Sequence, residues 1–216
     1  MIKGAIFDVD GTLLDTMPMW DAVGDLYLKN KGIIAHPDLR DILFKMTVTE
    51  GAVYMKEAYN LEESVQEIID GTTKLARVFY EEEAPLKAGV TETLQILQEN
   101  AVIMAVATAS DVSYIQKAFE RLGISKYFKN IVSCEEVGVG KESPLVFYKT
   151  VELLGTPVEE TYVFEDALHA IETAKKVGFK TVGIYDNSSK KQWEKIKEIA
   201  DVSVDSLEEF SLELIG

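Results

Sequence analysis

The chain has 216 residues, 47% of them hydrophobic, which suits one domain or one and a half around a sizeable core. Its 37 acidic and 22 basic residues give a net charge of −15, which disfavours nucleic acids and anionic lipid surfaces as partners. The longest apolar run, residues 101–107, is too short to span a bilayer, and Asp8 comes too early for a signal peptide. A single cysteine, Cys134, excludes an intrachain disulfide. We therefore expect a cytoplasmic protein.

The first predicted element is a buried strand that ends at two carboxylates. The apolar run Ile2–Phe7 is followed directly by Asp8 and Asp10, and then by Gly11 and Thr12. A Gly-Thr pair permits a turn whose backbone N–H groups point inward, and carboxylate oxygens suit a metal ion. This layout favours a site that holds a metal ion and transfers a phosphoryl group to a carboxylate; the alternative is a strand that ends in a solvated acidic turn.

The segment between the first and second predicted strands is unusually long, and its pattern is almost wholly helical. One helix, Val90–Glu99, is enough to connect the two strands, whereas an apolar stripe over residues 65–79 predicts a further long helix. We therefore interpret residues 17–83 as an inserted helical cap. The remaining residues, 1–16 and 84–216, are predicted to form a discontinuous α/β core.

Strands and helices alternate in the rest of the chain. Helical stripes end at Gly123 and Gly155, which are typical helix-terminating residues, and Ser143-Pro144 is expected to start a helix. This alternation indicates an α/β fold with a doubly wound parallel sheet. The six predicted strands are Ile2–Phe7, Val102–Ala107, Ile131–Ser133, Tyr162–Phe164, Thr181–Tyr185 and Val202–Val204.

Polar clusters follow the first four predicted strands. Besides Asp8 and Asp10, they are Thr108-Ala109-Ser110 after the second strand, Gly140-Lys141 in the loop after the third, and Glu165-Asp166 after the fourth. The carboxyl ends of parallel strands meet at one edge of a sheet, which is where ligands bind in such folds. We therefore expect the four clusters to form one site, although a helix cap at 165–166 and a solvated surface lysine at 141 are the alternatives.

These motifs and their order resemble the haloacid dehalogenase-like phosphohydrolase superfamily, and the helical insert is similar to that of its β-phosphoglucomutase-like branch. The resemblance covers the whole chain and implies a Rossmann-like core with an inserted cap. The chain departs from the family at Glu142, where proline usually follows the lysine. It also has Ala167 and His169 where serine and a later glycine are common, so a hydrogen bond that supports a metal ligand is expected to be lost.

The resemblance implies Mg²⁺-dependent phosphoryl transfer with the following roles. Asp8 matches the nucleophile that forms an aspartyl-phosphate, and Asp10 matches the acid/base group. The implied Mg²⁺ ligands are carboxylates of Asp8 and Asp166 and the backbone carbonyl of Asp10, with Glu165 bound directly or through water.

Further resemblance-based roles concern the substrate. Thr108 and the amide of Ala109 are expected to hold phosphoryl oxygens, and Lys141 is expected to supply positive charge beside the nucleophile. Trp20 and Lys45 are the candidate substrate-binding residues in the cap. The indole of Trp20 suits stacking on a sugar ring, but it also begins an apolar stripe and is equally interpreted as cap core.

The resulting hypothesis is a monomeric phosphomonoesterase acting on a small phosphorylated metabolite, most simply a sugar phosphate. The alternative is a phosphosugar mutase that uses the same aspartyl-phosphate; against it, Trp20 stands where mutases usually have histidine, and no glycine follows Lys45. A third hypothesis is a non-enzymatic regulator that binds Mg²⁺ or carries a phosphoaspartate. The pair Asp8 and Asp10, together with the long cap, argues against that third hypothesis.

Overall fold

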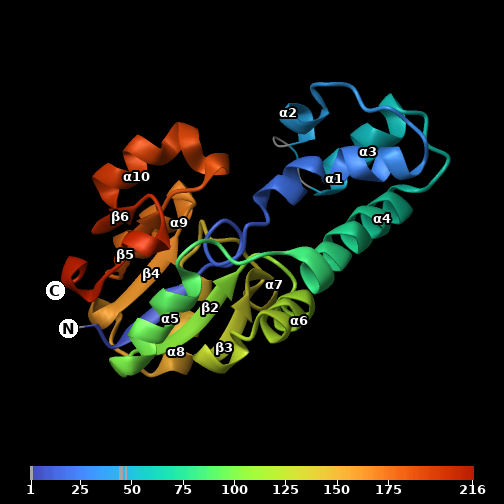
Figure 1. Ribbon diagram of the computed structural model, residues 1–216. Helices are drawn as coiled ribbons and strands as arrows, with labels where there is room; N and C mark the ends of the chain where they lie inside the picture. The colour runs from blue at the N-terminus through green and yellow to red at the C-terminus, as the bar shows by residue number, and fades with distance from the viewer. Residues whose placement is uncertain (1, 44–45, 47) are drawn as a thin grey trace. The chain divides into compact units, whose positions relative to one another are not determined.

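The computed structural model describes residues 2–43, 46 and 48–216 (Figure 1). The chain divides into two compact units, Met1–Asp15 with Ala84–Gly216, and Thr16–Glu83. We call them the α/β unit and the cap unit. The predicted assignment of 1–16 with 84–216 and of 17–83 to separate domains stays a prediction, because a geometric division does not test independent folding.

The α/β unit contains a six-stranded parallel sheet with the strand order β3-β2-β1-β4-β5-β6. The doubly wound parallel sheet predicted from the sequence is therefore confirmed. The third strand differs most from its prediction, since it begins at Phe128 rather than Ile131. The strands are β1 (Gly4–Phe7), β2 (Ile103–Thr108), β3 (Phe128–Ser133), β4 (Thr161–Glu165), β5 (Lys180–Ile184) and β6 (Val202–Val204).

The helices of this unit largely follow the apolar stripes. Gly123 and Gly155 both adopt positive φ at helix C-termini, as predicted. The predicted start at Ser143 is wrong, because Pro144 occupies the N-cap position. The helices are α5 (Val90–Glu99), α6 (Val112–Leu122), α7 (Cys134–Val137), α8 (Leu145–Leu154), α9 (Leu168–Lys176) and α10 (Trp193–Ile199), with 3₁₀ turns at Ser125–Tyr127, Val158–Glu160, Asn187–Gln192, Leu207–Glu209 and Leu212–Leu214.

Both faces of β1 are buried, which explains its continuous apolar sequence. On one face, Ile6 belongs to an apolar cluster with residues of α8 and α9. On the other face, the ring of Phe7 stacks on that of Phe164, with ring centroids 4.3 Å apart. Burial of both faces holds β1 rigidly at the centre of the sheet, so the loop that follows it starts from a fixed position.

The cap unit is helical, as predicted. Ser64 and Glu67 form a capping box at the start of its longest apolar stripe, where each side chain accepts the other residue's backbone N–H. A buried cluster that includes Tyr27, Leu28 and Ile68 forms its core. The elements are α1 (Met17–Asn30), α2 (Leu39–Leu43), α3 (Val48–Ala58), α4 (Val65–Val78) and a π-helical turn, Phe79–Glu83.

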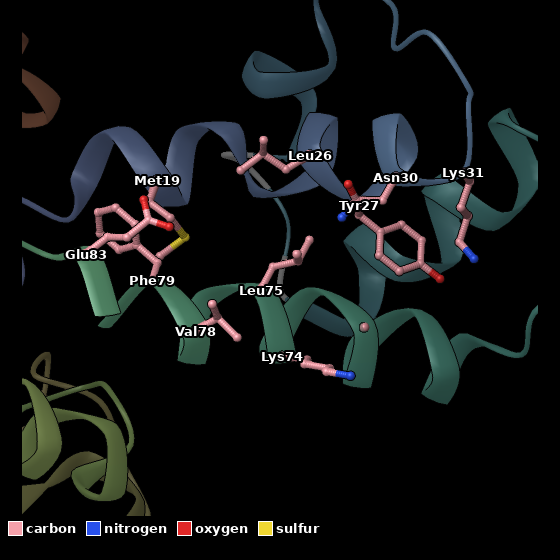
Figure 2. A pocket seen from close by; sticks show the side chains of 11 residues that line it. Met19, Leu26, Tyr27, Asn30, Lys31, Lys74, Leu75, Val78, Phe79 and Glu83 are labelled. Atoms are coloured by element: carbon pink, nitrogen blue, oxygen red, sulfur yellow. The ribbon is translucent and has the colours of Figure 1, made fainter. Parts of the chain in front are cut away.

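An open groove of about 520 Å³ lies between α1 and α4 of the cap unit (Figure 2). Apolar side chains such as Leu26, Leu75 and Val78 line its middle, while Lys31 and Glu83 lie at opposite ends. Among the described residues, no helix is long and apolar enough to cross a membrane.

Candidate active site

The candidate site lies in the α/β unit at the carboxyl edge of the sheet. β1 lies between β2 and β4 in the sheet. The chain continues from β1 to β2 on one side and from β4 to β5 on the other, so the loops after β1 and β4 leave the sheet in opposite directions. Such a switch point is where open α/β sheets bind ligands. Asp8 directly follows β1, Thr108 is the last residue of β2, and Glu165 is the last residue of β4.

The loop after β1 is a tight turn. The N–H groups of Leu13 and Leu14 both donate to the carbonyl of Val9. Gly11 and Thr12 donate their N–H groups to carbonyls of this same turn, so the predicted turn at this pair is present and these two amides point into it. The turn fixes the positions of the side chains on either side of it.

Glycine is required at position 11 for two reasons. Gly11 has φ +86°, which L-residues rarely adopt, and a Cβ there would lie 2.7 Å from Oδ2 of Asp166. The backbone of the β1 loop therefore approaches the carboxylate at the end of β4 closely.

Three buried carboxylates converge at this point. Asp8, Glu165 and Asp166 each offer one oxygen, and these three oxygens lie within 4.8 Å of one another. Their residues are only 6%, 1% and 6% exposed. The sequence prediction that they come together is confirmed, and the alternative of a solvated acidic turn is excluded for Asp8.

Lys141 is buried among these carboxylates rather than solvated. Its ammonium donates to Oδ1 of Asp8 and to Oε1 of Glu165, the latter at 2.6 Å. Burial lowers the pKa of Lys141, but the negative charges of Asp8 and Glu165 raise it by a larger amount, so the pKa of Lys141 lies above its ordinary value. Lys141 is therefore a fixed positive charge beside Asp8.

One ammonium does not compensate three carboxylates, and the pKa values reflect this. Burial raises the pKa of Asp8 to about 8, with Lys141 opposing and Glu165 and Asp10 adding to the rise. Burial also raises the pKa of Asp166, and the charges of Glu165 and Asp8 add to it. The site therefore contains more negative charge than its own residues balance.

This donor set fits Mg²⁺. The converging ligand atoms are all carboxylate oxygens, which is the ligand type that Mg²⁺ prefers. A divalent cation would balance the two negative charges that remain after Lys141 is counted. Asp8 and Asp166 would hold the ion, joined by the Asp10 carbonyl and by Glu165 directly or through water.

Asp10 lies partly buried at the same edge and pairs with the loop after β2. The hydroxyl of Ser110 donates to Oδ2 of Asp10 at 2.6 Å. Thr108 is fully buried, and its Oγ1 accepts the N–H of Ser110, which leaves the Thr108 hydroxyl proton to be donated. Ala109 is exposed between them. Sequence reasoning assigned no role to Ser110, although its two-residue spacing from Thr108 was the available signal.

Hydrogen bonds support the acidic residues although Ala167 has no hydroxyl. The Thr12 hydroxyl donates to Oδ1 of Asp166 across 3.4 Å, and the N–H of Ala167 donates to Oε2 of Glu165 at 2.9 Å. The expected loss of support at position 167 is thus partly offset from the β1 loop. His169 is exposed on α9.

Asp186 and Lys87 lie beside the site and were missed by sequence reasoning. Lys87 donates to Oδ2 of Asp186 at 2.6 Å and to the carbonyl of Tyr185 at 3.0 Å. The negative charge of Asp186 is a further contribution that raises the pKa of Asp166. The position of Asp186 just after β5 was the signal in the sequence that could have identified this residue.

The two candidate substrate residues belong to the cap unit. Trp20 is 37% exposed, and its indole N–H donates to the hydroxyl of Tyr80 at 2.9 Å. Its ring also meets the ring of Tyr80 edge-on, with centroids 6.3 Å apart. Lys45 lies outside the described residues. The substrate-binding role of both residues stays a prediction.

A family model for haloacid dehalogenase-like hydrolases matches residues 5–184. The phosphorylated carbohydrates phosphatase of Thermotoga maritima is 25% identical over 181 residues, covering 84% of each chain. Hexitol phosphatase B of Escherichia coli K12 is 25% identical over 219 residues, covering 100% of this chain and 97% of that protein. The phosphoglycolate phosphatase of Yersinia pestis is 27% identical over 190 residues, covering 85% and 81%.

Solved structures share the same fold. A Thermotoga maritima protein provisionally named a β-phosphoglucomutase superposes with a TM-score of 0.83 at 26% identity, covering 96% of each chain. CbbY from Rhodobacter sphaeroides, solved in complex with xylulose-1,5-bisphosphate, superposes with a TM-score of 0.77 at 20% identity, covering 97% of this chain and 96% of that one.

Proposed function

The chain belongs to the haloacid dehalogenase-like hydrolase family, and we propose that it is a Mg²⁺-dependent phosphatase that acts through an aspartyl-phosphate on a small sugar phosphate. The observation that carries this proposal is the buried contact of Lys141 with Asp8 and Glu165, which places a fixed positive charge against a candidate nucleophile. Curated relatives are named phosphatases, which supports hydrolysis as the reaction.

Asp8 is the proposed nucleophile. One of its carboxylate oxygens attacks the phosphorus, and the bond between phosphorus and the leaving oxygen breaks, which gives an aspartyl-phosphate and an alcohol. Lys141 stabilises the negative charge that builds up beside Asp8 when the phosphate ester approaches the carboxylate. Mg²⁺, when bound by the carboxylates, supplies further screening of that repulsion and aligns the phosphoryl group.

Asp10 is the proposed acid/base group. In the first step it gives its proton to the departing oxygen, so the product leaves as an alcohol rather than an alkoxide. In the second step it accepts a proton from the water that attacks the aspartyl-phosphate. That attack breaks the bond between phosphorus and Asp8, which releases inorganic phosphate and regenerates the carboxylate.

The loop after β2 is proposed to bind the phosphoryl oxygens. The Thr108 hydroxyl retains a proton to donate, and Ala109 is exposed where its backbone amide can contribute. This loop leads into α6, whose first turn follows at Val112, and such strand-to-helix junctions favour anions.

A sugar phosphate is the proposed substrate class. Relatives along most of the chain are named for phosphorylated carbohydrates and hexitols. Trp20 is partly exposed, and its indole is the type of side chain on which a sugar ring can stack. Roles for Trp20 and Lys45 in substrate binding are part of the proposal, as are the monomeric state and the cytoplasmic location.

Phosphate release from a panel of phosphomonoesters, with and without Mg²⁺, tests the proposal. We expect turnover that requires Mg²⁺ and is lost in Asp8→Asn, a change that keeps the shape and removes the nucleophilic charge. Asp70→Asn is the matched control, because Asp70 is exposed on α4, has no role in the proposed chemistry and should retain full activity. Wild-type protein that releases no phosphate from any ester would refute the phosphatase proposal.

A phosphosugar mutase is the second candidate, favoured by the likeness to the Thermotoga maritima structure named for that activity. It would use the same aspartyl-phosphate but return the phosphoryl group to a second hydroxyl. Isomerisation of a sugar phosphate that is primed by a bisphosphate, without net release of phosphate, would identify it. The non-enzymatic alternative is not supported, because the family and the named relatives are enzymes.

A further inference from the structure

Ser110 joins the candidate acid/base residue to the neighbouring loop. Its hydroxyl lies 2.6 Å from Oδ2 of Asp10, the length of a charge-assisted O–H···O⁻ hydrogen bond. The two residues are 100 positions apart but follow adjacent strands, because Phe7 of β1 pairs with Val106 of β2. The bond therefore connects two loops that emerge side by side from the sheet.

Ser110 is itself held in place from both sides. Its N–H donates to Oγ1 of the fully buried Thr108 at 3.0 Å. On its other side, Asp111 accepts the N–H of Ser113 as the N-cap of α6. The Ser110 hydroxyl thus projects from a backbone that is fixed between a strand end and a helix start.

A hydroxyl is chemically suited to hold an acid/base group. It can donate to Oδ2 when Asp10 is a carboxylate, and it can still donate to Oδ2 when Asp10 carries its proton on Oδ1, which leaves that proton for the leaving group. An ammonium in this place would add a positive charge that favours the ionised state, which is the direction in which Lys141 acts on Asp8 against the effect of burial. Ser110 can therefore hold the side chain in one orientation through both halves of a proton-transfer cycle.

The reaction gives this contact a task. Proton transfer to a leaving oxygen needs the Asp10 carboxyl group within hydrogen-bond reach of that oxygen. The hydrogen bond from Ser110 to Oδ2 restricts the orientations that this carboxyl group can adopt, because Ser110 is itself held by Thr108.

We propose that Ser110 is a positioning residue that fixes the Asp10 carboxyl group for proton transfer to the leaving group. The inference rests on the proposed function, because it assumes that Asp10 is the general acid. It predicts an effect that depends on how much the leaving group needs a proton.

The test compares two phosphate esters as substrates of the 216-residue chain with Mg²⁺. One is an alkyl ester, the best sugar phosphate of the panel, whose leaving oxygen requires protonation. The other is p-nitrophenyl phosphate, whose leaving group departs readily without it. The parameter compared is kcat/KM, because it includes only the steps up to departure of the leaving group and excludes hydrolysis of the aspartyl-phosphate.

Three variants make the test specific. Ser110→Ala removes the hydroxyl, and Ser110→Thr restores one at the same place. Ser113→Ala is the matched control, because the Ser113 hydroxyl also donates to a carboxylate at 2.6 Å, but to the exposed Asp111. Thermal unfolding of each variant reports whether the fold is intact.

We expect Ser110→Ala to lower kcat/KM for the alkyl ester by about 10- to 100-fold, since general acid catalysis contributes at least ~100-fold, and to lower it less than about threefold for the aryl ester. Ser110→Thr should recover most of the loss, and Ser113→Ala should match wild type on both esters.

Three results would overturn the inference: equal losses on both esters, no loss on either ester, or failure of Ser110→Thr to recover activity on the alkyl ester. In each case hydrolysis by the wild-type protein would leave the proposed function standing. Wild-type protein that hydrolyses neither ester would overturn both.

Discussion

The ammonium of Lys141 lies 2.6 Å from Oε1 of Glu165, and the two side chains are only 6% and 1% exposed. The same ammonium contacts Asp8, so a single cation neutralises part of a cluster of three buried carboxylates. Burying a charge without a partner costs several kcal/mol, and this makes the stability of the site depend on Lys141.

Replacing Lys141 with methionine should destabilise the protein strongly. The change leaves Glu165 buried without its counter-ion, and Asp8 as well where it is ionised, so we expect the free energy of unfolding to fall by about 3 to 5 kcal/mol in urea titrations at pH 8 without Mg²⁺. Lys3→Met is the control, because Lys3 forms an ion pair with Glu160 in which it is 59% exposed, and the loss there should stay below about 1 kcal/mol. Similar losses in the two variants would contradict this account.

Asp8 should make stability depend on pH in the absence of a metal. Its pKa in the folded protein is raised to about 8 from an ordinary 3.8, so between these values the folded state binds a proton that the unfolded state releases. The contribution of Asp8 is therefore favourable at low pH and is lost as the pH rises toward 8, by at most about 1.4 kcal/mol per pH unit.

Urea titrations of wild type and Asp8→Asn at pH 5 and pH 8, both with EDTA, measure this contribution. We expect the stability of Asp8→Asn relative to wild type to increase from pH 5 to pH 8, reaching an advantage of about 1 to 2 kcal/mol. Lys141 keeps Glu165 as a partner in that variant. Saturating Mg²⁺ should remove the advantage, and parallel pH curves for the two proteins would refute the explanation.

The parts of the site that could be predicted from the sequence are those fixed by strand ends. Asp8, Thr108 and Glu165 lie at or directly after the ends of adjacent parallel strands, so an apolar run and the residue that follows it determine their place. Burial of both sheet faces makes the apolar runs of β1, β2, β4 and β5 nearly continuous, which is why the sequence reveals these four strands clearly.

The parts that could not be predicted depend on side-chain direction and on long loops. The sequence places Ser110 and Asp186 just after strands, but it does not indicate that Ser110 reaches Asp10 or that Lys87 reaches Asp186. Each contact requires a particular rotamer on two segments about a hundred residues apart. The helix start at Ser143 was placed one residue early, since Pro144 occupies the N-cap position itself.

Asp186 should contribute stability that disappears in acid. Burial raises its pKa, but the hydrogen bonds from Lys87 and Ser188 outweigh burial and hold the pKa below 3.8. A lowered pKa means that the stabilisation is fully present above 3.8 and is lost as the pH falls through the folded-state value. Asp186→Asn should therefore cost about 2 kcal/mol at pH 7 and progressively less below pH 4.

The control for Asp186 is Glu160→Gln, which breaks the exposed pair with Lys3 and should cost under about 1 kcal/mol at pH 7. Chemical denaturation at several pH values measures both differences. A cost for Asp186→Asn that stayed constant between pH 7 and pH 3 would show that packing, rather than the ion pair with Lys87, is responsible.

Gly11→Ala should weaken Mg²⁺ binding, and a matched glycine isolates the cause. Gly11 and Gly123 both have positive φ, at +86° and +72°, so alanine at either position carries a backbone cost of about 1 to 2 kcal/mol. Only at Gly11 would the new Cβ also lie 2.7 Å from Oδ2 of Asp166, whereas at Gly123 it meets nothing within 4 Å. Asp166 must move in the first variant and can stay in the second.

We expect isothermal titration calorimetry to show that Mg²⁺ affinity is reduced by about tenfold in Gly11→Ala and unchanged in Gly123→Ala. Equal affinities in the two variants would exclude Asp166 as a ligand held by this close approach.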